Sequence, residues 1–419
     1  MMQKKICMYG LLSAFLCCGT ALAQQQQHTV EVIPFGDMDQ WIDRQIKESG
    51  IIGGALKNVY AIGPTATIRE NKAYKNMGGS PWATSNVMAR VAGITKTNTS
   101  VFPEKRGDGY CARMDTRMES VKVLGIVDIT VLAAGSMFLG EVHEPIKGTK
   151  NPQKMLNSGI PFTKKPIAVQ FDYKVNMSDR EKRIRATGFS RITDVEGKDF
   201  PEVNLFLQKR WEDKDGNIFA KRVGTMVVRY YNTTDWHNNA TYSIMYGDIT
   251  GDPAYKPHMM RLQVEERYAI NSKGESVPVK EVAWGTEEDA PTHLLLQFTS
   301  SHGGAYIGSP GNSLWIDNVK LVFRCQRFLS YESAGYDGVR CIVGELEHIS
   351  QNQGNGIVHQ MFRNAAFCHV NCRHMVLLLS LILYVNTLIA GKGPARPSES
   401  FQPSAGPESI KNGSIMIFC

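Results

Sequence analysis

Cysteine is nearly absent from the middle of this 419-residue chain. Three of the nine cysteines fall in the first 23 residues and five follow Phe323, so that Cys111 alone lies between. A single cysteine cannot form an internal disulfide, and it is more often a small packed residue than a nucleophile. The central part must therefore be held together by an ordinary hydrophobic core.

A strong charge of one sign is also missing from the central part. The formal net charge of the chain is +7, of which the first 23 residues carry +2 through Lys4 and Lys5. Residues after Phe323 carry another +2, from eight Lys or Arg against six Asp or Glu, which leaves +3 for residues 24–323. A charge this small excludes the basic footprint of a nucleic-acid-binding protein.

Familiar catalytic motifs are absent as well. The sequence contains no GxSxG, no HExxH, no P-loop and no GxGxxG that precedes a helix. A glycosidase needs two carboxyl groups across a cleft, and the spacing of the acidic residues does not pair any two of them. The catalytic residues are therefore unknown, and whether the protein is an enzyme stays open.

The N-terminus has the pattern of a secretory signal peptide. Lys4 and Lys5 precede an uncharged apolar stretch that ends in Ala21-Leu22-Ala23. We expect a signal peptide over residues 1–23 and export to the periplasm, the cell surface or the outer membrane. Cys17 and Cys18 suggest lipidation as an alternative, but neither follows the small residues that a lipid-attachment site requires.

Residues 324–419 differ in character from the rest. They contain no tryptophan, and residues 375–391 form a 17-residue apolar run, MVLLLSLILYVNTLIAG, at the short limit for a membrane span. We expect a tail that is foreign to the domain and poorly ordered. A C-terminal membrane anchor is the alternative, and membrane association is expected only through this tail or through lipidation.

Residues 30–323 have the pattern of an all-β domain. The segment PIAVQFDYKV alternates apolar and polar residues, and Asp215-Gly216 and Ser272-Lys273-Gly274 each stand between two strand-like arms. VKVLGIVDITVLAAGSMFLG is either one buried strand or two strands with a bend near Gly135. Helical spacing occurs in DMDQWIDRQIKES. We predict an antiparallel two-sheet jelly-roll sandwich with long loops and one short N-terminal helix.

Asp317 needs a partner in this fold. Regular strand alternation in LWIDNVKLVF would place it on one face with four apolar side chains, namely Trp315, Val319, Leu321 and Phe323. A buried carboxylate requires hydrogen bonds, a cation or a counter-charge. Backbone amides of a loop, a lysine or arginine, and Ca²⁺ all remain open, with Asp37 and Asp39 as further oxygen ligands for a calcium ion.

Aromatic residues in polar loops are candidates for binding sugar, because a ring face packs against sugar CH groups while nearby polar groups bind hydroxyls. Trp236, beside Asp235 and Asn238, is the best candidate. Trp82 and, in the glycine-rich loop SSHGGAYIGSPGN, Tyr306 are further candidates. Each tryptophan could instead be a structural plug over a core edge.

Several segments, in order, resemble the putative carbohydrate metabolism domain, a family of exported bacterial proteins of glycan utilisation. The similar segments are IPFGDMDQWIDRQIKESGIIGG, SPWATSNV, VLAAGSMFLGE, GIPFTKKPIAVQFDYKV and SSHGGAYIGSPGNSLWIDNVKLVF. The resemblance implies a lectin-like jelly roll. It also implies a structural Ca²⁺ held by Asp317 with Asp37 or Asp39.

These observations predict an exported, non-catalytic protein whose partner is an oligo- or polysaccharide. A glycoside hydrolase on the same fold is the alternative, because a β-sandwich hosts both functions. The arrangement of carboxyl groups in a cleft distinguishes the two.

Overall fold

The computed structural model describes residues 28–324, apart from 75, 77–78, 92, 124–126, 149–150, 189–190, 260 and 264–266. These residues belong to one compact unit, Met1–Gln326. The expected signal peptide and the apolar run 375–391 lie outside the described residues. Within the described part, no helix is long and apolar enough to cross a membrane.

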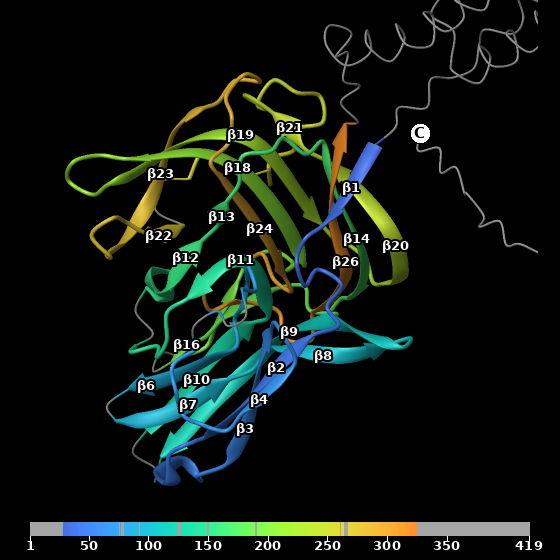
Figure 1. The fold of residues 1–419 in the computed structure, drawn as a ribbon. Coiled ribbons are helices and arrows are strands. Elements are labelled where there is room, and N and C mark those ends of the chain that lie inside the picture. The colour runs from blue at the N-terminus through green and yellow to red at the C-terminus, as the bar shows by residue number, and fades with distance from the viewer. Residues whose placement is uncertain are drawn as a thin grey trace, which may run out of the picture. The chain divides into compact units, whose positions relative to one another are not determined.

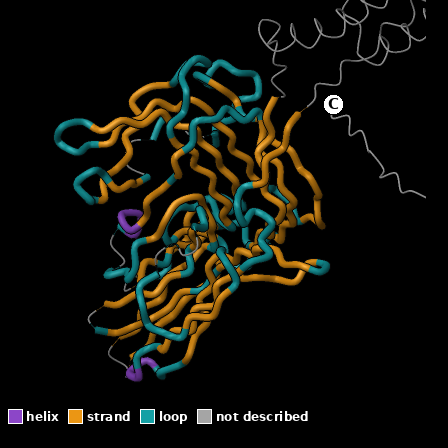
Figure 2. Tube along the Cα trace, viewed as in Figure 1, coloured by secondary structure: helices purple, strands orange, loops and turns teal. Residues whose placement is uncertain are grey.

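Strands make up most of this unit (Figure 2). One sheet has eight strands. Its main order is β16 (Thr187–Gly188), β10 (Val127–Ala134), β9 (Gly109–Val123), β26 (Ser313–Arg324), β14 (Ala168–Asn176) and β20 (Thr234–Ser243). Two further strands complete it, β1 (His28–Val32) on β26 and β8 (Val101–Arg106) on β9.

The second large sheet has ten strands. Its main order is β12 (Leu156–Ser158), β11 (Ser136–Val142), β24 (His293–Thr299), β18 (Glu202–Glu212), β19 (Ile218–Arg229), β23 (Ser276–Trp284) and β22 (Tyr268–Ile270). Added to it are β13 (Ile160–Pro161), β21 (Met245–Tyr246) and β5 (Trp82–Thr84). The β19–β23 pair is parallel, a departure from the antiparallel pairing predicted throughout.

Smaller sheets complete the fold. Their strands are β17 (Thr193–Val195), β15 (Arg183–Arg185) and β25 (Ile307–Gly308); β3 (Leu56–Ile62), β2 (Trp41–Lys47) and β4 (Ala66–Ile68); and the hairpin of β6 (Val87–Val91) and β7 (Ile94–Asn98). Two short 3₁₀ turns, η2 (Gly50–Ile52) and η3 (Pro152–Met155), are the helical elements of the described residues.

The main hydrophobic core lies between the two large sheets, which Figure 1 shows side by side at β14 and β26 on one hand and β18 and β24 on the other. Phe171 of β14 meets Phe298 of β24 edge to face, with ring centroids 5.1 Å apart. Cys111 is a free, buried thiol, and burial together with Glu104 and Asp317 raises its pKa to about 12. The predicted β-sandwich held by an apolar core is therefore confirmed.

Turn chemistry placed two hairpins correctly, whereas the segment 121–140, expected as one or two strands, contributes to three, β9, β10 and β11. Gly216 and Gly274 both have positive φ, at 90° and 79°, in the two predicted hairpins β18–β19 and β22–β23. The chain also bends at Gly135, between β10 and β11. A Cβ there would lie 2.3 Å from the carbonyl oxygen of Ser100, so only glycine fits.

The predicted N-terminal helix is wrong, because its central residues form strand β2. Ile42, Arg44 and Ile46 are all buried, which is the period of a strand, and β2 pairs with β3 and β4. Arg44 is buried because Glu144, 100 residues away, forms an ion pair with it. The pattern looked helical because Arg44 was taken as a solvent-facing residue. No local feature of the sequence shows that Arg44 pairs with Glu144.

Candidate functional site

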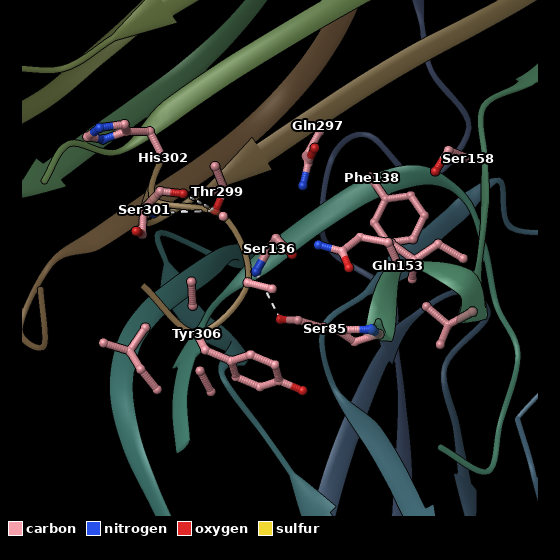
Figure 3. Close-up of a pocket in the computed structure, with 18 of the residues that line it drawn as sticks. Ser85, Ser136, Phe138, Gln153, Ser158, Gln297, Thr299, Ser301, His302 and Tyr306 are labelled. Carbon is pink, nitrogen blue, oxygen red and sulfur yellow. Dashed lines mark hydrogen bonds between the residues drawn. The ribbon is translucent and has the colours of Figure 1, made fainter. Parts of the chain in front are cut away.

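A groove of about 1420 Å³ lies within the described part of the chain. Strands of the ten-stranded sheet line one part of it, and β6, β7 and β10 line another. Figure 3 shows Phe138, Gln153, Gln297 and Tyr306 around this hollow. A cavity of this kind with convergent polar groups is the default place to look for a ligand site.

Strand alternation puts polar side chains on the floor of the groove. On β18, Val203 and Leu205 point into the core, so Glu202 and Asn204 project from the opposite face. On β24 the same alternation turns Gln297 and Thr299 toward the groove, where the pairing sets Asn204 opposite Gln297 and Glu202 opposite Thr299.

Arginines hold these floor residues in place. Arg267 donates hydrogen bonds to Asn204 Oδ1 at 2.8 Å and to Gln297 Oε1 at 2.6 Å. Arg229 Nε lies 2.6 Å from Glu202 Oε2. A planar guanidinium fixes each acceptor in one orientation. The floor therefore presents amide and carboxylate groups in fixed orientations; Asn204 and Gln297, held by Arg267, form the amide grid.

The glycine-rich loop after β24 forms one rim of the groove, and Asp199 holds it. The side chain of Asp199 is fully buried and accepts hydrogen bonds from Ser301 Oγ at 2.9 Å and the Ser309 amide at 2.8 Å. This loop carries Tyr306 and His302 into the lining of the groove. Tyr306 has a φ of 64°, a left-handed conformation that a tyrosine rarely adopts.

Described residues of the connection between β21 and β22 form another part of the rim and are anchored to a buried ion pair. Arg222 and Glu281 are bonded to each other with both side chains fully buried. Glu281 Oε2 accepts the Gln263 amide at 2.7 Å, and Arg222 donates to the Arg261 carbonyl at 3.0 Å. Burial, followed by the nearby Arg229, lowers the pKa of His258 on this rim.

The predicted sugar site at Trp236 is partly closed by an arginine. The guanidinium of Arg106 lies 3.8 Å from the centroid of the Trp236 ring, and Arg106 also donates to Asn238 Oδ1 at 2.6 Å. Asp235 is exposed on the same strand. One face of the ring is therefore covered, and this cluster lies on the eight-stranded sheet, not in the groove.

Trp82 cannot bind sugar, and that prediction is corrected. The ring is fully buried in the main core, and its Nε1 donates to the Pro34 carbonyl at 2.9 Å. Trp82 therefore has the structural role in the core that the sequence analysis gave as its alternative. Tyr306, by contrast, lines the groove.

Asp317 lies at a β-bulge, which corrects the expected single face. Asn318 has a φ of 54°, and the β14–β26 register shifts beside it. As a result Leu314 and Ile316 share the core with Val319 and Leu321, while Asp317 meets Arg106. Of the partners left open by the sequence, an arginine, Arg106, and a backbone amide, that of Asn318, both bond to Asp317.

The residues predicted for calcium do not assemble into a ligand set. Asp317 Oδ2 is bonded to Arg106 and Oδ1 accepts the Asn318 amide, while Asp39 Oδ1 accepts the Tyr110 amide. Asp37 Oδ1 is buried with no hydrogen-bond partner among the described residues, a feature that would suit a cation. Nowhere in the described ranges, however, do three Asp, Glu, His or Cys side chains gather to hold a metal.

Arg106 is instead shared by two carboxylates. Its Nη1 lies 2.8 Å from Asp172 Oδ2 and also bonds Asp317. Burial alone would raise the pKa of Asp172, but the Asn239 amide and Arg106 lower it. At Asp317, burial prevails over Arg106 and raises the pKa. This group of Arg106, Asp172, Asp317, Asn238 and Trp236 is called the Arg106 cluster below.

Sequence reasoning missed most of the groove. Glu202, Asn204, Gln297 and Thr299 sit in strands where alternation does predict an outward face, but nothing local marks that face as a ligand site. Arg267 follows residues 264–266 in a long connection, and its partners are 30 and 63 positions away.

No curated protein matches the chain. One solved structure, described as a putative glycoside hydrolase from Bacteroides thetaiotaomicron, is similar at 17% identity and a TM-score of 0.35, over 65% of this chain and 76% of that one. A similarity this low carries no argument about fold or site.

A family model does match most of the described unit. The model of the putative carbohydrate metabolism domain matches residues 62–322, more than half of the chain. This range contains the ten-stranded sheet and all the residues named above on the groove floor and its rims. The chain therefore belongs to the putative carbohydrate metabolism domain family, and its function lies in carbohydrate metabolism.

Proposed function

We propose that the protein binds a glycan in the groove and does not cleave it. The observation that carries this proposal is the grid in which Arg267 holds Asn204 and Gln297 on the floor. Arg267 takes one lone pair of each amide oxygen, so the amide N–H groups and the second lone pair of each oxygen can bond to vicinal sugar hydroxyls. Because the grid is already fixed, little side-chain entropy is lost on binding.

An aromatic side chain completes the match to a sugar. Tyr306 lines the same groove as the amides, whereas Phe138, also in the lining, is buried in an apolar cluster. An aromatic ring packs against the CH face of a pyranose while neighbouring polar groups bind its hydroxyls. This combination of a ring and fixed amides favours carbohydrate over a purely apolar or a highly charged ligand.

The carboxylates of the groove favour binding over hydrolysis. A glycosidase needs one carboxyl group as acid and a second as base or nucleophile. Glu119 and Glu202 line the groove, but Glu202 has both oxygens engaged, Oε2 by Arg229 and Oε1 by Asn204. Glu119 pairs with Arg117.

A glycoside hydrolase remains the second candidate because Glu119 and Glu202 share one groove. If it is correct, reducing ends will be released from a bound glycan, and Glu202→Gln will abolish release while binding persists. Release that survives Glu202→Gln would exclude this residue from the chemistry.

A glycan array with the full-length chain tests the main proposal. We expect array hits, no release of reducing ends from them, and an affinity about fivefold lower in Gln297→Ala, since a hydrogen bond between neutral groups is worth about 1 kcal/mol. Gln170→Ala on β14 is the matched control, since Gln170 bonds Thr241 away from the groove. Equal affinity in both variants, or no hits at all, would overturn the proposal.

We also propose that the protein acts outside the cytoplasm, as the N-terminal sequence suggests. N-terminal sequencing of the secreted protein should begin at Gln24. A mature chain that begins at Cys17 or Cys18 would instead indicate lipidation.

A further inference from the structure

The groove has a second, apolar half that glycan hydroxyls alone do not explain. On β10, Ile129, Val131 and Ala133 recur at the strand period and line the groove. Across from them, Val87, Ala89 and Val91 do the same on β6. All six side chains are half-buried or exposed.

The alternate faces of the same strands are already packed. Leu132 of β10 is buried with Ile184 and Ala186, and Met88 of β6 is buried with Ile46 and Val59. Leu132 and Met88 thus have partners on the alternate faces, whereas the six apolar side chains of the groove face stay half-buried or exposed. Exposed apolar area costs about 25 cal/mol per Å², and contiguous patches of it mark interaction sites.

Strand β11 joins the two halves of the groove. Ser136, Phe138 and Val142 all line it from one side of this strand. Ser136 is next to the polar floor in Figure 3, whereas Phe138 packs with Val87 and Ile146 of the apolar half. The hollow is therefore continuous from the amide grid to the apolar wall.

The size of the hollow agrees with a ligand that fills both halves. Its volume of about 1420 Å³ exceeds the roughly 300–1,000 Å³ of ordinary ligand pockets. A sugar on the amide grid would leave the wall of β6 and β10 in water, whereas an apolar group attached to that sugar would cover it.

We propose that the groove takes an amphiphilic glycan, in which the sugar lies on the floor and an attached acyl chain or alkyl or aryl aglycone lies against β6 and β10. This inference rests on the proposed glycan-binding function and names its ligand class. Other occupants of the apolar wall, such as a second copy of the chain or residues 325–419 of the same chain, would exclude a small apolar probe and are outcomes of the test.

The test is a fluorescence titration of the full-length chain with N-phenyl-1-naphthylamine, a small apolar dye. We expect saturable binding of one dye per chain and displacement by octyl β-D-glucopyranoside at concentrations at least tenfold lower than by methyl β-D-glucopyranoside. Val131→Asp should weaken dye binding about tenfold, because a carboxylate on the wall opposes an apolar ligand. Ala89→Asp, on the facing strand, provides a second variant if the first does not fold.

Val30→Asp is the matched control, since Val30 is 49% exposed on β1 and lies outside the groove lining. It should leave dye binding unchanged. Absence of saturable binding, equal dye affinity in the Val131→Asp and Val30→Asp variants, or equal displacement by the octyl and methyl glycosides would overturn the inference.

Failure of this inference and failure of glycan binding are separable. Dye binding does not require sugar recognition, so an array without hits counts against the amide grid alone. Array hits whose affinity does not depend on Val131, together with no dye binding, would retain the glycan site and remove its apolar half.

Discussion

Two arginines in different parts of the fold lie in different surroundings, Arg106 in a closed cluster and Arg267 in an open groove. Arg106 on the eight-stranded sheet bonds Asp172 and Asp317, and its guanidinium stacks on the ring of Trp236. Arg267 beside the ten-stranded sheet bonds the amides Asn204 and Gln297 on the floor of a large groove. Charge neutralisation makes the first a structural cluster, whereas the fixed amides of the second are the surface for which we propose glycan binding.

The largest expected effect is the loss of the arginine from the closed cluster. Arg106→Ala leaves Asp172 and Asp317 buried, adjacent and without their counter-charge, so we expect the free energy of unfolding to fall by about 3 kcal/mol. Urea unfolding measures it. Lys105→Ala, an exposed neighbour stacked on Tyr110, should change stability by about 0.5 kcal/mol or less.

Measuring glycan affinity in Arg106→Ala tests whether the Arg106 cluster also takes part in binding. If the Arg106 cluster only stabilises the fold, Arg106→Ala will retain the array hits of the parent protein at temperatures where it is folded. A selective loss of binding without a loss of stability would make this cluster a second recognition site.

A smaller effect is expected at the rim of the open site. Asp199→Ala removes the acceptor of Ser301 and Ser309 and should lower the free energy of unfolding by about 2 kcal/mol. Because the rim carries Tyr306, glycan affinity should fall as well, by about tenfold. The exposed Asp194→Ala on β17 is the control, and parallel losses in both variants would contradict a special role for Asp199.

A pH-dependent effect should arise outside the groove lining, at His293 of β24. Burial, followed by Arg210, lowers the pKa of His293 to about 4. The unfolded chain binds a proton there below about pH 6.5, whereas the folded protein stays neutral until about pH 4, so stability falls as the pH decreases through this window. Thermal unfolding between pH 7 and pH 4 should show a shallower decline in His293→Gln, and an unchanged slope would refute the assignment.

The smallest expected effect concerns calcium. Since Arg106 takes the place next to Asp317 that the sequence left open for a cation, addition of EDTA should leave the melting temperature unchanged within error. A decrease of several degrees, restored by Ca²⁺, would show that Asp37 and Asp317 belong to a metal site after all.

Local pattern predicted the fold better than the site. The alternation in β14, the turns at Gly216 and Gly274 and the bend at Gly135 were readable because each depends on neighbours in sequence. The strand β2 was mistaken for a helix because Arg44 is buried by the distant Glu144. Trp82 and Trp236 looked alike in sequence, and only packing separates a core plug from a half-covered ring.

By itself the sequence determined that the body is an apolar-cored, disulfide-free β protein, since alternation, turn glycines and cysteine positions are local facts. Tertiary structure alone decided which polar groups meet. Arg106 reaches Asp317 across 211 positions and Arg267 reaches Asn204 across 63, and such pairs form only when sheet registers bring their strands together. Side-chain partners depend on the three-dimensional packing. The groove and the Arg106 cluster could therefore not be predicted from the sequence.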